Sequence, residues 1–513
     1  MSRVLPAHPN LEHLKKQAKD LLQDFAQGNP AVVEQFNSVV STSATAQPKL
    51  ADAQHVIARE YGFASWAKLK EHVQSLAPFD PVKALVAAVN INDDERVDQV
   101  LRQHPELKSK LNDPLPGCGF GGTVLLGAVR AANRKMVDIL LAAGADINQR
   151  SHWWAGSFGV LDDDRDLAPY LMERGAILDA HATARLGMFD KLKELISANP
   201  ELVHARGGDG QTPLHFAATI EIAEYLLDHG ADIDARDIDH ESTPAQYMVR
   251  KRQEVARYLV SRGCWTDILM AAALGNLELV RKHLDTDPAS VHKSVNEHYF
   301  PKQDPRSGGT IYTWFLGSNK TAHMVAREFR HEEIFRLLME RSPAALKLAL
   351  ACEMCDEAAF QSLLASDPDL AKTLSDDERR KIVAAAEGNN TQAVRMMLAA
   401  GWPVDVRAGG MGGTALHFAA WHGNTEMIRE ILKDHPPLEA PDTSHGGTPL
   451  SWALHGSKNS WERHKGDYAV ALELLLQAGA KAPKLTKELE ASEPALAVLR
   501  RHEEGSLGRH GVA

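Results

Sequence analysis

Short apolar runs at helical spacing recur in pairs along the chain, and each pair ends at a glycine or a proline. In GQTPLHFAATIEIAEYLLDHGAD, residues 210–232, one apolar stripe lies within 214–218 and a second within 222–227. Thr212 can cap the first helix, and Pro213 suits its first position, where no N–H donor is needed. Gly230 fits a left-handed stop. Helices this short need neighbours, so the pattern predicts a helical pair packed against further pairs.

The same phrase returns in phase at four other places along the chain. It begins at Thr123, Thr243, Thr414 and Thr448, and TALHFAA at 414–420 is its fullest copy. The phrase resembles the ankyrin repeat, which has a period of ~33 residues and a T-P-L-H-x-A signature. This resemblance covers residues 82–482 and implies an all-α ankyrin-repeat solenoid of about 11–12 units, each with two helices and a β-hairpin finger. It also implies that His215 and His417 are structural and bond to loop backbone.

The spacing of the stops indicates that the units differ in length. Gly175 to Pro200, Gly263 to Pro288 and Pro343 to Pro368 are too short for a finger. We therefore predict three units without fingers, which would leave gaps in the finger row. The unit at 210–232 lacks a counterpart of 421–423, which predicts a clipped turn between its helices. Residues 292–313 and 456–467 are insertions, and insertions in repeat arrays map to loops.

The two ends of the chain depart from the repeat. Residues 1–77 show amphipathic patterns at 11–22, 53–61 and 66–73, with a Ser/Thr/Ala-rich link at 38–49. They resemble segments that precede ankyrin arrays in bacterial proteins. We predict an N-terminal helical cap on the solenoid of residues 78–482, the alternative being an independent binding module. Residues 483–513 predict a capping helix at 488–501 and a polar tail. The whole combination resembles an uncharacterised group of bacterial ankyrin-repeat proteins, which implies no assigned chemistry.

Composition narrows the classes of partner. The 513 residues carry a net charge of −11 and no long Lys/Arg run, which argues against a nucleic-acid binder. No apolar run approaches the ~20 residues that span a bilayer, and the start does not read as a secretory signal. Four cysteines in so long a chain do not form a disulfide framework. We expect a cytoplasmic monomer that does not bind membranes.

Three motifs that suggest chemistry have better structural explanations. The G-x-G-x-x-G at 117–122 follows no strand, so it is interpreted as a finger turn. The near nucleophile elbow around Ser157 has alanine at its first glycine position and no strand before it. Cys352 and Cys355 lie in a helical pattern without two further zinc ligands nearby, so they are interpreted as core residues. We expect no enzyme activity, metal site or cofactor.

Aromatic residues in fingers, stops and insertions are the candidates for partner binding. Exposed aromatic side chains anchor interfaces more often than chance, although they could equally pack long loops onto the array. The candidates are Trp153, Trp154, Tyr299, Phe300, Tyr312, Trp314, Trp402, Trp421 and Trp461.

Two functional hypotheses follow from these residues. The first is a non-catalytic scaffold that binds an unknown protein partner through the concave face and finger loops of the array. The alternative is an enzyme or small-ligand binder with a site on the non-consensus segments 151–166 and 292–323. It predicts a pocket that joins one of two sets of side chains: Trp153, Ser157 and Asp163, or His298, Tyr312, Lys320 and His323.

Overall fold

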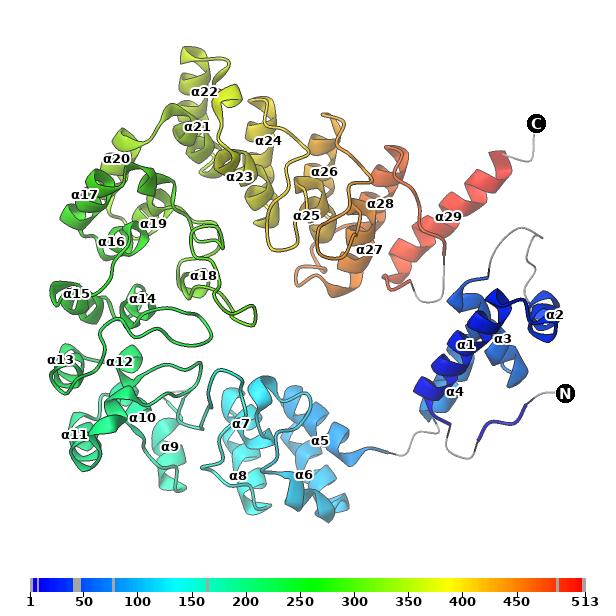
Figure 1. The fold of residues 1–513 in the computed structure, drawn as a ribbon, viewed down its shortest axis with the longest axis horizontal. Coiled ribbons are helices and arrows are strands. Elements are labelled where there is room, and N and C mark those ends of the chain that lie inside the picture. The colour runs from blue at the N-terminus through cyan, green and yellow to red at the C-terminus, as the bar shows by residue number, and fades with distance from the viewer. Residues whose placement is uncertain are drawn as a thin grey trace. The chain divides into compact units, whose positions relative to one another are not determined.

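Short helices follow one another along nearly all of the described chain (Figure 1). This computed structural model describes residues 3–6, 9–39, 48–75, 79–162, 166–485 and 489–509. In those ranges the extended structure is limited to three isolated β-bridges, Trp153–Gly156, Ser294–Thr321 and Ala408–Gly413. The contacts divide the chain into two units, one of residues 80–350 and one of residues 1–79 with 351–513. Within the described ranges, no helix has the length and apolar character that crossing a bilayer requires.

The N-terminal segment forms a four-helix cluster with its own core. Its helices are α1 (Leu11–Ala26), α2 (Pro30–Val39), α3 (Leu50–Glu60) and α4 (Trp66–Ser75). Leu14, Phe36, Val56 and Leu69 are buried together between them. The pattern missed α2, while residues 40–47 of the expected link lie outside the described part. Capping of the array by this segment stays a prediction.

Residues 80–350 are built from successive helix pairs, and the pairing follows the repeat phrase. The helices are α5 (Pro81–Asn90), α6 (Asp94–Gln103), α7 (Val124–Arg130), α8 (Arg134–Ala142), α9 (Ala168–Glu173), α10 (Ala180–Leu186), α11 (Phe189–Ala198), α12 (Pro213–Phe216), α13 (Ile220–Asp228), α14 (Pro244–Met248), α15 (Gln253–Ser261), α16 (Ile268–Leu274), α17 (Leu277–Thr286), α18 (Tyr312–Phe315), α19 (Ala322–Glu328) and α20 (Glu332–Arg341). The short 3₁₀ turns are η1 (Pro105–Lys110), η2 (Gly119–Gly121), η3 (Pro200–His204) and η4 (Pro288–His292).

The helices of this unit pack in two layers. First helices contact first helices, as α10 does α12 and α12 does α14, and second helices contact second helices, as α13 does α15. This stacking buries the apolar stripes that short helices cannot shield alone. His215 joins neighbouring pairs, because its Nδ1 accepts from the Thr212 N–H (3.0 Å) while its Nε2 donates to the Ser242 carbonyl (3.2 Å). The structural role predicted for this histidine is confirmed.

The unit at 210–232 accommodates its missing residues in a different way from the prediction. Helix α12 ends at Phe216, whereas its counterpart α25 (Ala415–His422) continues for another turn. The turn between α12 and α13 is not clipped, since residues 217–219 still connect them. The deletion therefore shortens the first helix. The Ala217 carbonyl, left without a helical partner, accepts from Arg252 Nη1 at 3.1 Å.

The three predicted units without fingers are confirmed by the helix bounds. Helix α10 begins at Ala180 soon after α9 ends at Glu173, and α16 begins at Ile268 after α15 ends at Ser261. Helix α21 (Ala344–Glu353) likewise follows α20 directly.

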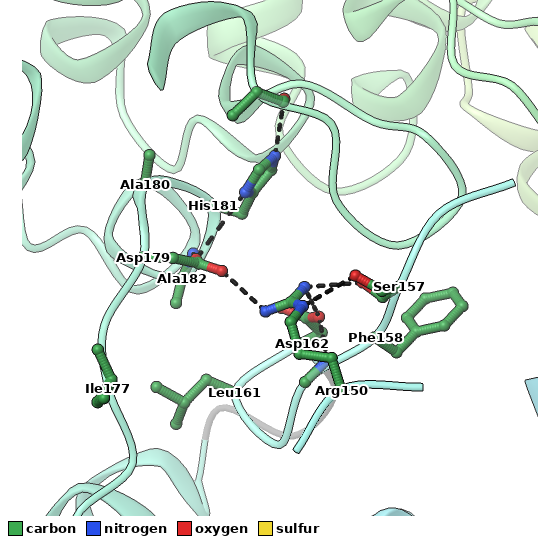
Figure 2. A network of polar contacts seen from close by, with 12 residues as sticks. Arg150, Ser157, Phe158, Leu161, Asp162, Ile177, Asp179, Ala180, His181 and Ala182 are labelled. Atoms are coloured by element: carbon green, nitrogen blue, oxygen red, sulfur yellow. Dashed lines mark hydrogen bonds and ion pairs between the residues drawn. The ribbon is translucent and has the colours of Figure 1, made fainter. Parts of the chain in front are cut away.

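The expected gap at the first finger-less unit is filled by the long segment at 151–162. Arg185 of α10 donates to the Leu161 carbonyl of this segment, and a Cβ on Gly156 would collide with the carbonyl oxygens of Gly207 and Gly208 in the next finger. Arg150 holds it in shape (Figure 2): the guanidinium donates to Ser157 Oγ and Asp179 Oδ2, each at 3.0 Å. It also pairs with Asp162 Oδ2 at 3.0 Å. A neighbouring segment thus takes the place of the missing finger.

Residues 351–509 contain a second set of stacked pairs. The helices after α21 are α22 (Glu357–Ser366), α23 (Asp376–Glu387), α24 (Thr391–Ala399), α25 (Ala415–His422), α26 (Thr425–Leu432), α27 (Pro449–Asn459), α28 (Tyr468–Gln477) and α29 (Glu493–Arg509), with η5 at Leu370–Thr373. First helices α23, α25 and α27 stack in order, as do second helices α24, α26 and α28. Helix α29 packs on α28 and begins later than the predicted helix at 488–501, whose first residue lies outside the described part.

Candidate functional site: a cleft between a finger and an insertion

The insertion at 293–311 lies against the finger at 236–243, although some sixty residues separate them in sequence. The finger precedes α14, and the insertion connects η4 to α18. The base of the insertion is closed by a bridge between Ser294 and Thr321. The Asn319 N–H donates to the Val295 carbonyl at 2.8 Å, which brings both ends of the segment together.

Hydrogen bonds fasten the insertion to the finger along its length. The Glu241 carboxylate accepts from the backbone N–H groups of Gln303 and Asp304 at 2.8–2.9 Å. The Gly308 N–H donates to the Asp239 carbonyl at 2.9 Å. The Ile311 N–H donates to Ser242 Oγ at 3.1 Å. These bonds hold the insertion against the finger, and those to the Glu241 carboxylate are of the stronger, charge-assisted kind. The two segments therefore form one continuous surface.

The prediction of a gap in the finger row is also wrong at the second unit without a finger, because the insertion occupies that place. The pair α16–α17 has no finger, and the segment at 293–311 reaches past it to the finger at 236–243. Arg306 continues the row, since its guanidinium lies over the Trp154 ring at 4.4 Å. Both long segments of residues 80–350 therefore occupy positions that missing fingers leave open.

A cleft of about 450 Å³ lies where finger, insertion and finger-less unit meet. Its volume is within the usual range for binding pockets. It is lined by Arg236, His240, Glu241, Ser242, Gln246, Trp265, Asp267, Lys293, Tyr299, Phe300, Pro301, Lys302, Gln303, Gly309 and Thr310.

The floor of the cleft is a buried and fully bonded acid. Asp267 caps α16 by accepting from the Met270 N–H at 2.8 Å and accepts from the Tyr312 hydroxyl at 3.0 Å. Burial raises the pKa of Asp267 and, together with the neighbouring carboxylate, raises that of Tyr312 well above its ordinary value. The hydroxyl thus stays protonated and donates to the acid.

The rim of the cleft combines cations with aromatic rings. The Arg236 guanidinium lies 5.5 Å from the centre of the Trp265 ring, whose exposed fraction is 39%. Lys302 Nζ pairs with Glu297 at 3.0 Å, and Lys293 Nζ lies 3.7 Å from Asp287. Both lysine side chains are partly exposed, and ion pairs near the surface contribute little to stability.

The structure separates the aromatic candidates of this unit. Tyr299 and Phe300 line the cleft, and Phe300 packs edge-on against Tyr312 at 5.5 Å. Tyr312 itself is fully buried, so it is not available to a partner. Trp314 is 71% exposed but is not part of the cleft lining. Trp153 is half-buried and packs on Trp154 and on Phe120.

Of the aromatic candidates in the other unit, one is buried and two reach the surface. Trp402 is buried, and its indole N–H donates to the Glu378 carbonyl at 3.0 Å, so it is a core residue and not a surface anchor. Trp461 is 69% exposed and packs edge-on against half-buried Trp421 at 5.7 Å. A partner role for these two residues stays a prediction.

The described side chains that the alternative hypothesis named do not line the cleft, although other residues of its second segment, 292–323, do. Ser157 Oγ accepts from Arg150, which is a cation and not a base, and Asp163 lies outside the described residues. In the second set, His323 is buried with its Nε2 2.8 Å from Ser342 Oγ. Lys320 pairs with Glu328, and His298 is exposed beside Tyr299.

The remaining sequence motifs have structural roles. Within G-x-G-x-x-G, Phe120 adopts a φ of 58° in the turn η2 and lies under the Arg130 guanidinium at 4.9 Å. Cys352 is buried as predicted, and burial raises the pKa of its thiol to about 12, but the prediction that Cys355 is a core residue is wrong because Cys355 is exposed.

Sequence reasoning missed several residues that form the cleft. Arg236 and Lys293 have no repeat signature, and they meet only because the insertion crosses a whole unit. Trp265 carried one usable signal: it comes directly after the stop at Gly263 in a unit without a finger, so little chain was available to cover it.

Comparisons with known proteins agree with the repeat. Family models described as ankyrin repeats match residues 180–268 and residues 382–429. The chain is 35% identical over 75 residues to the serine/threonine-protein kinase VIK of Arabidopsis thaliana, which is 14% of this chain and 17% of that protein. It is 28% identical over 155 residues to the mouse ankyrin repeat and SAM domain-containing protein 6, which is 26% of this chain and 17% of that protein.

These likenesses bear on the repeats alone, since the chain spans about a sixth of the length of each relative. The matched residues 180–268 include α10 to α15 and the finger at 236–243, which forms one wall of the cleft. The helix pairs, the capping threonines and the bonded histidines agree with the matches, and we conclude that the protein contains ankyrin repeats and has their all-α fold.

Proposed function

We propose that the protein is a scaffold that holds a segment of another protein in the cleft between the finger at 236–243 and the insertion at 293–311. The observation that supports this most is the hydrogen bonding of the two walls to each other. A cleft with walls fixed in advance loses little conformational entropy when a ligand binds.

The chemistry of the lining suggests what the bound segment carries. Tyr299, Phe300 and Trp265 offer aromatic surface, which anchors many protein interfaces. Arg236, Lys293 and Lys302 offer positive charge, while the Glu241 carboxylate is already occupied by backbone N–H groups. A partner segment with an apolar side chain next to an acidic one fits this surface.

The test is a quantitative pull-down from the source organism, followed by titration with the purified partner. Tyr299→Ala and Lys302→Ala should each weaken the partner's affinity at least tenfold, because truncation of an interface anchor costs about 2 kcal/mol or more. Trp461→Ala, which removes the exposed aromatic candidate of the other unit, tests the competing binding surface, and the proposal predicts that it leaves the affinity unchanged. Equal binding by all three variants, or a loss confined to Trp461→Ala, would contradict the proposal.

A further inference from the structure

Three side chains from two consecutive fingers converge beside the cleft. Asp209, Asp239 and His240 each bring one potential ligand atom to within 4.8 Å of the others. His240 Nε2 lies 3.9 Å from Asp209 Oδ2 and 3.8 Å from Asp239 Oδ2. These separations exceed a hydrogen bond. They are close to the spacing of about 3.4 Å between two ligands of one tetrahedral cation, since metal–ligand bonds measure about 2.0–2.2 Å.

The orientation of His240 is fixed by its other ring nitrogen. Nδ1 lies 2.9 Å from the Gly309 carbonyl oxygen, and a carbonyl can only accept, so Nδ1 carries the proton. In the neutral ring the Nε2 lone pair then faces the two carboxylates. Metal-binding histidines are commonly held in this way by a backbone carbonyl. The imidazole is therefore presented as a ligand by the insertion that covers it.

The Asp239 carboxylate is held in place by a hydrogen bond, and the negative charges of Asp209 and Asp239 are not balanced by a nearby arginine or lysine of the described chain. Asp239 Oδ1 accepts from the Gly308 N–H at 3.0 Å, which leaves Oδ2 toward His240. Asp239 and His240 side chains are only 10% and 11% exposed. Within the described residues, neither Asp209 nor Asp239 forms an ion pair with an arginine or lysine. Asp209 Oδ1 is buried and accepts no hydrogen bond in the part of the chain that the structure describes.

We propose that Asp209, Asp239 and His240 bind one divalent transition-metal cation, for which Zn²⁺ is the best match. A donor set of one imidazole and two carboxylates favours Zn²⁺ over Mg²⁺ and Ca²⁺, which prefer oxygen alone. Three protein ligands leave a further position for water. The cation joins the finger that contains Asp209 to the finger that contains Asp239. Sequence analysis expected no metal because these ligands do not lie in a motif with metal-ligand spacing.

The experiment uses the full chain, without an affinity tag and stripped of metal by a chelator. Isothermal titration with Zn²⁺ should show one strong site, and Co²⁺ should give the intense visible absorption of a low-coordinate complex. Asp209→Asn and His240→Gln should each weaken that site at least tenfold and remove the Co²⁺ bands. Asp239→Asn should weaken the site in the same way. Its amide oxygen can still accept the hydrogen bond from the Gly308 N–H, so the finger stays attached to the insertion.

The matched control is His445→Gln in the other unit. His445 is 75% exposed with Nδ1 4.0 Å from Asp442, so it pairs an imidazole with a carboxylate without a third ligand. This variant should bind Zn²⁺ as the unaltered protein does. Circular dichroism and melting of the metal-free variants separate loss of a ligand from loss of the fold. The proposal is overturned if correctly folded Asp209→Asn and His240→Gln retain the strong site, if the unaltered chain has none, or if Ca²⁺ or Mg²⁺ occupies it in preference to Zn²⁺.

Discussion

At the scale of single residues, buried polar groups define the contacts between neighbouring repeats. His215 and His417 each accept from the N–H of their capping threonine and donate to the backbone of the next finger, at Ser242 and Gly447. Burial lowers the pKa of both, that of His215 to about 3. Each histidine must therefore be neutral to keep both bonds.

This predicts how the two histidines respond to acid. NMR of the labelled imidazoles should show no titration of His215 between pH 8 and pH 5, and the pKa of His417 should lie below the ordinary value of about 6.5. An unfolded chain binds a proton at each position below about pH 6.5 and the folded chain does not. The free energy of unfolding should therefore fall as the pH drops below that value. Titration of His215 near pH 6.5 would disprove the bonding pattern.

Arg150 is the second residue with a measurable role. Arg150→Ala should lower the free energy of unfolding by about 1–3 kcal/mol, because it leaves the mostly buried Asp162 carboxylate without its cation. Urea denaturation measures this loss from the unfolding transition of residues 80–350. Arg341→Ala, which breaks an exposed pair with Asp285, is the control and should change stability by less than about 1 kcal/mol. Equal effects of the two would show that the Arg150 network is not structural.

At the scale of elements, the sequence predicted what depends on local pattern and missed what depends on contacts distant in the chain. Threonine caps and apolar stripes located the paired helices, and short spacings identified the units without fingers. Helix α2 was missed because its stripe is weak beside that of α1. The shortened α12 and the filled gaps were missed because they depend on contacts with distant segments: hydrogen bonds of Arg252 and Glu241, and the close approach of Gly156 to the next finger.

The attachment of the insertion to the finger can be tested directly. Glu241→Ala should speed hydrogen exchange in peptides that span 299–309, since the Gln303 and Asp304 N–H groups lose their acceptor. Exchange in α13 and α15 should not change. Glu254→Ala, an exposed glutamate on α15, is the matched control and should leave the insertion as protected as before. Unchanged exchange in Glu241→Ala would mean that the wall of the cleft is held by other contacts.

At the scale of the whole molecule, the chain is two sets of stacked repeats, and stability in such arrays is a sum of local terms. Leu214 and Leu416 occupy the same position of the repeat phrase in different units, and both are fully buried. They offer a matched pair of truncations that differ only in which unit they weaken.

Calorimetry of the two variants should separate the units. Leu214→Ala should lower the melting temperature of residues 80–350, and Leu416→Ala should lower that of the other unit. Each change should reduce the free energy of unfolding of its unit by the roughly 2–5 kcal/mol typical of a buried Leu→Ala change. A single transition that shifts equally in both variants would show that the units unfold together.

Hydrogen exchange of the full chain, with and without its purified partner, tests the account most directly. If the cleft is the binding site, the partner protects peptides spanning 236–243 and 299–310, and Tyr299→Ala abolishes that protection. Protection confined to residues 351–509, with these peptides unchanged, would contradict it.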